Sequence, residues 1–396
     1  MPGSSASPRL STLVLLSALA ILPINFFLPS LPQMAAEFGD YGLTGLSLAA
    51  YAIVSACLQL VLGPLSDRFG RRPVILGALA IFIAATVGCA LAPDARTFLA
   101  CRMVQAVIAP TYGVSLAVIR DTTNREQTAG RFGYLAMAWA IAPMLGPTAG
   151  GLLDQVFGWR ASFYVLALFG IAVLALCWTD LRETNTSRSK TMLEQYNAYP
   201  ELLGSKRFLA YCLCMAFSVG AFYAFLAGAP LAASAFDLSP TVLGLYMGSI
   251  TGGFLLGSFL AGRLAGNLPE ATLLIAGRVL ACGGLLFGIV LYFAGVDHVV
   301  ALFGPCLFVG VSNGLTQPSA NAAAISVRAT QTGSAAGLAG AITVAGASIM
   351  AAIAGAVLTE ENARSGLLMV MLASAIVALA AALFARHLDI DSPQTT

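Results

Sequence analysis

The chain has 396 residues, of which 58% are hydrophobic and only 10% charged, and its formal net charge is +2. This composition excludes an ordinary soluble domain, and the near-neutral charge gives no indication of a nucleic-acid partner. At about 20 residues for each helical crossing, plus short loops, a chain of this length allows roughly a dozen membrane spans.

Apolar runs follow one another along the whole sequence. They are continuous and about twice as long as the roughly ten-residue strands of a membrane barrel, so they favour helices. The first run follows Arg9 and resembles a secretory signal peptide, but it continues to Pro32 without a small-residue cleavage site, and we interpret it as a span. The twelve predicted spans are 11–30, 45–66, 73–92, 97–119, 131–153, 161–179, 207–232, 241–262, 271–294, 299–322, 334–358 and 364–385.

A charged loop separates the second and third spans. Asp67, Arg68, Arg71 and Arg72 lie there between Gly63 and Pro73. Glycine and proline suit a sharp reversal, and arginines favour the cytoplasmic side of a membrane. With both termini cytoplasmic, most basic residues fall inside, and those that fall outside are Arg96, Arg160 and Arg364.

A long polar stretch divides the chain into two halves of six spans. We predict an N-terminal bundle at 1–180, a cytoplasmic linker at 181–206 and a C-terminal bundle at 207–396. The segment Leu256–Arg263 follows the eighth span much as Leu62–Arg68 follows the second. Two such halves indicate pseudo-symmetric repeats with a substrate cavity between them near the bilayer midplane.

These features carry a family resemblance that covers nearly the whole chain. The loop from Gly63 to Pro73, preceded by Gln59 and Leu60, is similar to the signature loop of the major facilitator superfamily. Further motifs in the fourth, fifth, first, seventh and eleventh spans are Arg102–Ala106, Gly133–Gly151, Leu28–Pro32, Gly228–Pro230 and Thr332–Gly337. More narrowly, the chain resembles the Bcr/CflA group of drug:proton antiporters, which implies twelve helices in two bundles and alternating access.

One residue departs from that group. Asn25 occupies the first-span position where the group typically has an aspartate, and an amide cannot bind and release a proton at physiological pH. The acidic residues all lie in loops or near span ends. Proton coupling would therefore use an acid at the rim, such as Asp67 or Asp121, or a protonation step on the substrate itself.

Four charged residues are predicted to serve gating or coupling. The resemblance implies that Asp67, Arg71 and Asp121 form an ion-pair cluster that latches the two halves in the outward-facing state, whereas the alternative is a simple topology anchor. Arg102 lies within the fourth span, where a charge is expensive, so we expect it to face the cavity with Gln105 rather than reach the outer interface. For Arg278, in the ninth span, we expect the charged head to reach the cytoplasmic interface.

The predicted cavity wall combines aromatic and amide side chains, as pockets for amphipathic ligands do. For each aromatic the alternative is core packing or lipid contact, and the amides at 313, 317 and 321 could instead join helices by hydrogen bonds. With Arg102 as the deep charge, we expect neutral, zwitterionic or anionic substrates rather than cations. The predicted substrate-binding residues are Asn25, Tyr51, Gln59, Gln105, Tyr112, Met137, Phe222, Tyr223, Phe225, Tyr246, Asn313, Gln317 and Asn321.

Other chemistry finds little support in the sequence. The eight cysteines show no paired spacing and are interpreted as small apolar residues, the two histidines suggest no metal site, and no phosphate-binding loop for ATP is present. We therefore expect no cofactor, no catalytic residue and a monomer in the bacterial inner membrane, with lipid, a small-molecule substrate and protons as partners. The predicted function is export of drug-like or metabolite molecules; the alternatives are a nutrient importer or uniporter, and a non-transporting receptor.

Overall fold

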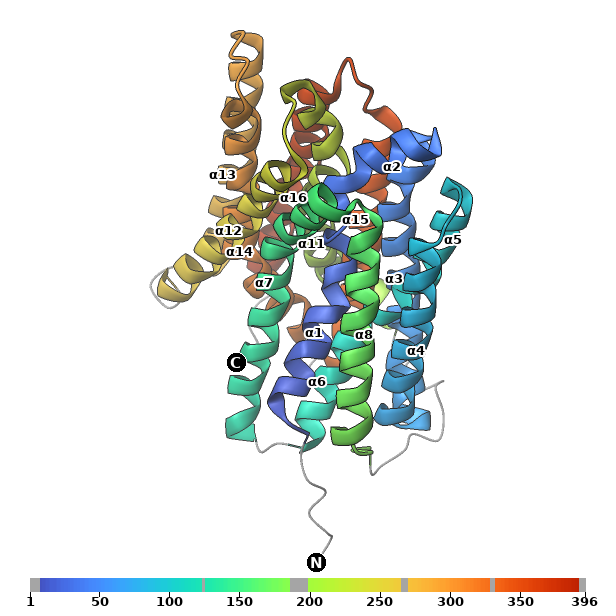
Figure 1. Cartoon of the computed structure of the whole chain (residues 1–396). Helices are drawn as coiled ribbons and strands as arrows, with labels where there is room; N and C mark the ends of the chain where they lie inside the picture. Colours follow the sequence, from blue (N-terminus) through green and yellow to red (C-terminus); the bar gives the residue numbers. More distant parts are fainter. Residues whose placement is uncertain (1–7, 123–124, 186–198, 265–269, 328–331, 392–396) are drawn as a thin grey trace, which may run out of the picture. The chain divides into compact units, whose positions relative to one another are not determined.

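A computed structural model describes residues 8–122, 125–185, 199–264, 270–327 and 332–391, and every regular element within these ranges is a helix (Figure 1). The chain divides into two compact units, Met1–Gln195 and Tyr196–Thr396. The division point lies inside the predicted linker at 181–206, of which residues 186–198 are outside the described ranges.

The N-terminal unit contains eight α-helices and two short 3-10 helices in its described ranges. They are α1 Leu10–Asn25, η1 Leu28–Ser30, α2 Leu31–Phe38, α3 Tyr41–Phe69, α4 Arg71–Ala90, α5 Ala95–Gln105, η2 Ala106–Ile108, α6 Thr111–Thr122, α7 Arg125–Phe157 and α8 Arg160–Asp180. The α1 helix packs against α6, α7 and α8, and α4 packs against α5 and α8 (Figure 1). Apolar residues of α1, α4, α6 and α8, such as Leu16, Phe82 and Val173, form its buried core.

The C-terminal unit contains seven α-helices and one short 3-10 helix in its described ranges. They are α10 Tyr199–Leu203, α11 Lys206–Ala233, η3 Ser234–Phe236, α12 Pro240–Leu264, α13 Glu270–Phe293, α14 Val299–Ser326, α15 Thr332–Val357 and α16 Ala363–Asp391. Small residues bring α12 and α14 into close contact, since a Cβ on Gly314 would lie 2.1 Å from the Phe254 carbonyl oxygen.

Helix ends follow local sequence. The Asp40 carboxylate caps α3 by accepting from Leu43 N at 2.8 Å, and Asp94 caps α5 by accepting from the backbone of Arg96 and Thr97 at 2.9 Å. The reversal between α3 and α4 is made at Gly70, whose φ of 106° favours glycine. The predicted reversal between Gly63 and Pro73 is therefore observed but confined to Gly70, since Gly63 lies in α3 and Pro73 in α4.

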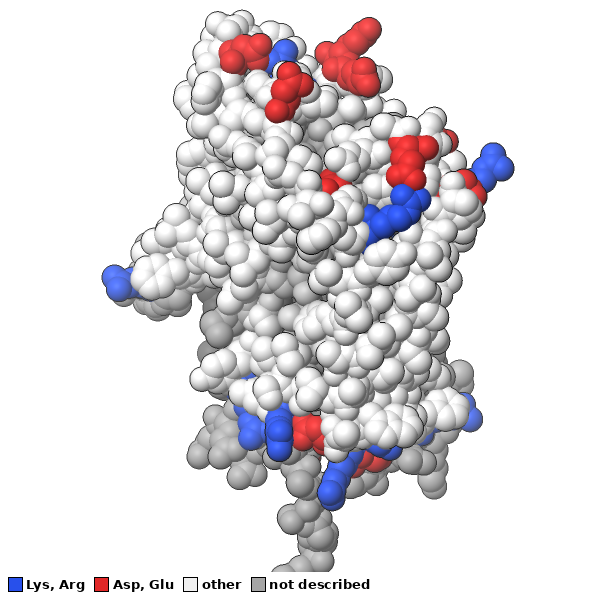
Figure 2. All heavy atoms as spheres, viewed as in Figure 1, with Lys and Arg blue, Asp and Glu red and all other residues white. Residues whose placement is uncertain are grey.

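The surface of the helices suits a hydrocarbon environment. Large apolar side chains such as Leu168, Phe157 and Phe293 are more than half exposed. On the face shown in Figure 2, charged side chains lie at helix ends. Within the described ranges, eleven helical stretches are long and apolar enough to cross a membrane.

Those eleven stretches correspond to eleven of the twelve predicted spans. The remaining one, predicted at 131–153, lies within the 33-residue α7 and is not among them. The number twelve therefore stays a prediction, while the all-α architecture is observed.

Candidate functional site

An ion-pair network surrounds Arg71 at the start of α4. Its Nη1 lies 2.5 Å from the Asp67 carboxylate on α3, and its Nε lies 3.3 Å from the Asp121 carboxylate on α6. Nη1 also donates to Ser66 Oγ at 2.5 Å. Arg71 is 5% exposed, and the two aspartates are partly buried, so these charges are less screened than surface pairs. The structure thus brings together the three residues predicted for the latch.

Glu183, just after α8, completes this network. Its carboxylate accepts hydrogen bonds from the backbone N of Arg71 at 2.9 Å and of Arg72 at 3.3 Å, where a helix N-terminus attracts negative charge. A Cβ on Gly70 would lie 2.2 Å from the same carboxylate, so glycine is needed for this approach. The role of Glu183 was not predicted, because its separation of 112 residues from Arg71 leaves no local signal in the sequence.

Arg102 lies fully buried inside the N-terminal unit. Its Nη1 donates to the Pro23 carbonyl oxygen at 3.0 Å and to Gln105 Oε1, and its guanidinium lies 4.3 Å from the ring centre of Phe27 and 4.5 Å from that of Tyr51. Gln105 in turn donates to Thr86 Oγ1 at 2.8 Å. The alternative in which Arg102 reaches the outer interface is therefore excluded in this structure. Its Nε and Nη2 have no hydrogen-bond partner.

Arg278 forms a second buried cluster, within the C-terminal unit. It is 2% exposed and donates to Ser218 Oγ, to Asn313 Oδ1 at 3.1 Å and to the Ser312 carbonyl oxygen at 3.2 Å. The prediction that Arg278 reaches the cytoplasmic interface is wrong, because α11 and α14 supply acceptors that hold the charge inside the protein. Asn313 joins α14 to α11 and α13, as the helix-joining alternative describes.

Asn25 lies at the contact between α1 and α7. Asn25 is 1% exposed, its Nδ2 donates to the Ile21 carbonyl oxygen at 3.1 Å, and its Oδ1 has no partner. A Cβ on Gly146 would lie 3.3 Å from Asn25 Cβ, and one on Gly150 would lie 1.7 Å from the Phe26 carbonyl oxygen. The fifth-span glycines therefore bring α7 against the backbone of α1.

The remaining predicted cavity residues have diverse surroundings. In the N-terminal unit, Gln59 and Tyr112 are half-buried, and the side chain of Met137 lies outside the described part of the chain. In the C-terminal unit, Phe225 is fully buried and packs edge-on against Phe303, which also stacks with Tyr246 at 5.0 Å.

The other predicted cavity residues of the C-terminal unit differ in their exposure. Tyr223 is buried beside the half-buried Phe222, with ring centres 6.1 Å apart. Gln317 is half-buried and Asn321 exposed, so the three amides of α14 do not share one environment. The burial of Phe225 favours the core-packing alternative for that residue.

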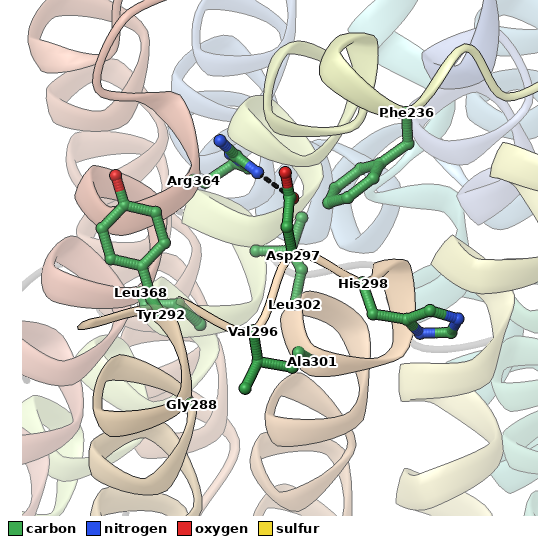
Figure 3. A pocket seen from close by; sticks show the side chains of 10 residues that line it. All are labelled: Phe236, Gly288, Tyr292, Val296, Asp297, His298, Ala301, Leu302, Arg364 and Leu368. Carbon is green, nitrogen blue, oxygen red and sulfur yellow. Dashed lines mark hydrogen bonds and ion pairs between the residues drawn. The ribbon is translucent and has the colours of Figure 1, made fainter. Parts of the chain in front are cut away.

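Two cavities of the C-terminal unit lie away from all these residues. In the smaller one, of about 20 Å³, Arg364 pairs with Asp297 between the rings of Phe236 and Tyr292 (Figure 3). That volume suits about one water molecule, whereas ligand pockets have about 300–1,000 Å³. A groove of about 410 Å³ borders it and is lined mainly by apolar residues such as Phe287 and Phe308.

A family model described as Major Facilitator Superfamily matches residues 13–351. The chain belongs to the Major Facilitator Superfamily. It is thus a multi-pass membrane transporter and not an enzyme, as predicted.

Relatives within the superfamily include drug-resistance proteins. The chain is 37% identical to a chloramphenicol resistance protein of Pseudomonas aeruginosa over 56% of its own length and 54% of the relative's. It is 30% identical to the multidrug resistance protein MdtL of Escherichia coli over 71% of each chain, and 29% identical to the multidrug transporter MdfA of Yersinia pestis over 69% of this chain and 70% of that one. The match to the first relative thus spans about half of that protein's length.

Solved structures share the fold. A peptide transporter aligns with a TM-score of 0.77 at 13% identity, covering 97% of this chain and 96% of that one. A bacterial homologue of the lysosomal transporter Spinster, in an inward-facing conformation, aligns with a TM-score of 0.74 at 17% identity over the whole of both chains. The predicted major facilitator fold is confirmed.

Proposed function

We propose that this transporter exports small amphipathic drug-like or metabolite molecules across the bacterial inner membrane by alternating access, in exchange for protons. The observation that carries the proposal is the similarity to chloramphenicol and multidrug resistance proteins. The distribution of arginine and lysine along the sequence supports a cytoplasmic position for both termini.

The buried arginines bear on the class of substrate. Arg102 and Arg278 are fully or nearly fully buried, and no carboxylate among the described residues is recorded in an ion pair with either. Each unit therefore contains a buried arginine without a carboxylate partner in the described ranges, and Arg102 is the one that keeps two donors, Nε and Nη2, free for a substrate. We expect neutral, zwitterionic or anionic molecules, such as chloramphenicol, to be exported in preference to permanently cationic dyes.

We assign the role of the latch to the ion-pair network around Arg71. Asp67, Arg71 and Asp121 connect α3, α4 and α6, and Glu183 connects this point to the segment after α8. A network that joins three helices and the start of the linker can respond to a movement of any of them. We infer that it holds the predicted cytoplasmic end closed in the outward-facing state.

Direction of transport decides between exporter and importer. Inside-out membrane vesicles carrying the protein should accumulate labelled chloramphenicol when their lumen is made acidic, because export then fills the lumen. Arg102→Ala should abolish accumulation, whereas Arg96→Ala, at an exposed position of the same helix, should match the wild type. Equilibration without accumulation would establish the uniporter that Asn25 favours, and accumulation only in right-side-out vesicles would establish an importer.

A further inference from the structure

A polar line runs along the tight contact between α7 and the end of α1. Gly146, Gly150 and Asp154 follow at intervals of four residues and therefore share one face of α7. This face meets Asn25, Phe26 and Ser30 in the same order. The line thus joins the Asn25 position to the predicted outer end of the N-terminal unit.

Asp154 is the one acidic residue that is buried in the described part of the chain. It is 3% exposed, and neither of its carboxylate oxygens has a hydrogen-bond partner. The Ser30 hydroxyl lies beside it without completing a hydrogen bond. Together with Oδ1 of Asn25, three polar side chains along this line have buried oxygen atoms without a hydrogen-bond partner, although buried polar groups are normally paired.

Among the residues that the structure describes, no cation is recorded in an ion pair with Asp154. The α1 and η1 segments contain no charged residue, and the charged residues of α6 lie at its far end, at Arg120 and Asp121. On α8 the nearest is Arg160, which pairs with Glu37 at 2.7 Å, and the other is Asp180 at the opposite end. The other charged residues of α7 lie in its first turns, at Arg125–Arg131.

Other acids of the N-terminal unit are engaged. Asp67 and Asp121 pair with Arg71, while Asp180 accepts from Thr12 Oγ1 at 2.7 Å. A carboxylate beside a cation is held in its charged form, whereas an unpaired carboxylate in an apolar contact is expensive unless it takes up a proton. Asp154 is therefore suited to change its protonation state when its access to water changes.

We propose that Asp154 is the carboxylate that carries the exchanged proton. This inference rests on the proposed function and replaces the rim acids Asp67 and Asp121 as the coupling group. One proton adds to one carboxylate oxygen from water at the predicted outer end, and the neutral acid fits the closed α1–α7 contact. The same proton leaves to water when the contact loosens, and the charged form becomes hydrated.

The test uses the full-length protein in proteoliposomes that enclose a pH-sensitive dye, with chloramphenicol as the probe. Two quantities are measured, namely proton movement on drug addition and exchange of labelled for unlabelled drug, which needs no net proton transfer. In Asp154→Asn we expect loss of drug-dependent proton movement with exchange retained. Asp154→Glu should keep proton movement, and Glu360→Gln, at an exposed acid of the other unit, should match the wild type.

The outcomes separate the two proposals. Asp154→Asn with wild-type proton movement would overturn the role of Asp154 while leaving the antiporter intact. A wild type that exchanges drug without moving protons would overturn both proton coupling and this role, and one that does neither would overturn the proposed function. If Asp154→Asn does not fold, drug-induced proton release is measured as a function of pH in the detergent-solubilised Asp154→Glu protein and in the wild type. The same pH midpoint of release in both proteins would overturn the proposal.

Discussion

Replacement of Gly150 by alanine tests the close contact between α7 and the end of α1. The new Cβ would lie 1.7 Å from the Phe26 carbonyl oxygen and 2.7 Å from its carbon, and these backbone atoms cannot rotate away as a side chain can. The helices must therefore separate. Overpacking of this kind costs about 1–3 kcal/mol, beyond any gain from the better helix propensity of alanine.

Gly77→Ala is the matched control. Gly77 lies in α4, and a Cβ there has nothing within 4 Å. One kcal/mol corresponds to about 2–4 °C in Tm for a domain of 150–250 residues, so Gly150→Ala should lower Tm by about 2 to 12 °C. Thermal unfolding in detergent, followed by size-exclusion chromatography after heating, gives the comparison. Equal Tm values for the two variants would refute the close α1–α7 contact.

Three further substitutions test other parts of the structure. Arg278→Ala removes the hydrogen bonds that its guanidinium donates to Ser218, Asn313 and the Ser312 carbonyl oxygen, and the loss should cost about 1–3 kcal/mol in thermal unfolding, whereas a role at the interface predicts no change. Glu183→Ala removes the cap from α4 and should lower stability by about 0.5–2 kcal/mol, with faster trypsin cleavage in the segment after α8 as a second measurement. Hydrogen bonds from the Thr97 backbone and hydroxyl hold the pKa of Asp94 below its usual value. The stability that the Asp94 carboxylate contributes to the folded state is therefore fully present above the unfolded pKa of about 3.9, and it is lost as the pH falls through the lower pKa of the folded state. The Tm difference between wild type and Asp94→Ala should accordingly be constant at neutral pH and shrink in acid.

Much of the fold could be predicted because lipid imposes long apolar helices. Eleven predicted spans match helical stretches of the structure, and the reversal predicted between Gly63 and Pro73 contains the turn at Gly70. The proximity of Asp67, Arg71 and Asp121 was also expected, although from a family resemblance rather than from spacing. A family resemblance can predict contacts between residues that lie far apart in the sequence.

The site was less predictable because hydropathy does not report which face of a helix meets another helix. Arg278 and Arg102 look alike in sequence, as single arginines within apolar runs, yet only one was expected to be buried. Asp154 lies one residue beyond a predicted span and was expected in a loop or near a span end, whereas the structure buries it at the α1–α7 contact. Glu183 was missed since its partners lie in another helix.

The two buried arginines differ in the donors they leave unused, and this difference separates a structural role from a binding role. Insertion scales place the cost of an arginine at the centre of a membrane helix at about 2.5–3.5 kcal/mol, so each needs acceptors within the protein. Arg278 has three acceptors on α11 and α14 and leaves only Nε without a partner. Arg102 binds through Nη1 alone and leaves both Nε and Nη2 unpaired, with aromatic rings within 4.5 Å. A hydroxyl or carbonyl group of a substrate would satisfy those two donors, so Arg102 is the arginine we assign to binding, and Arg278 is the one we assign to packing.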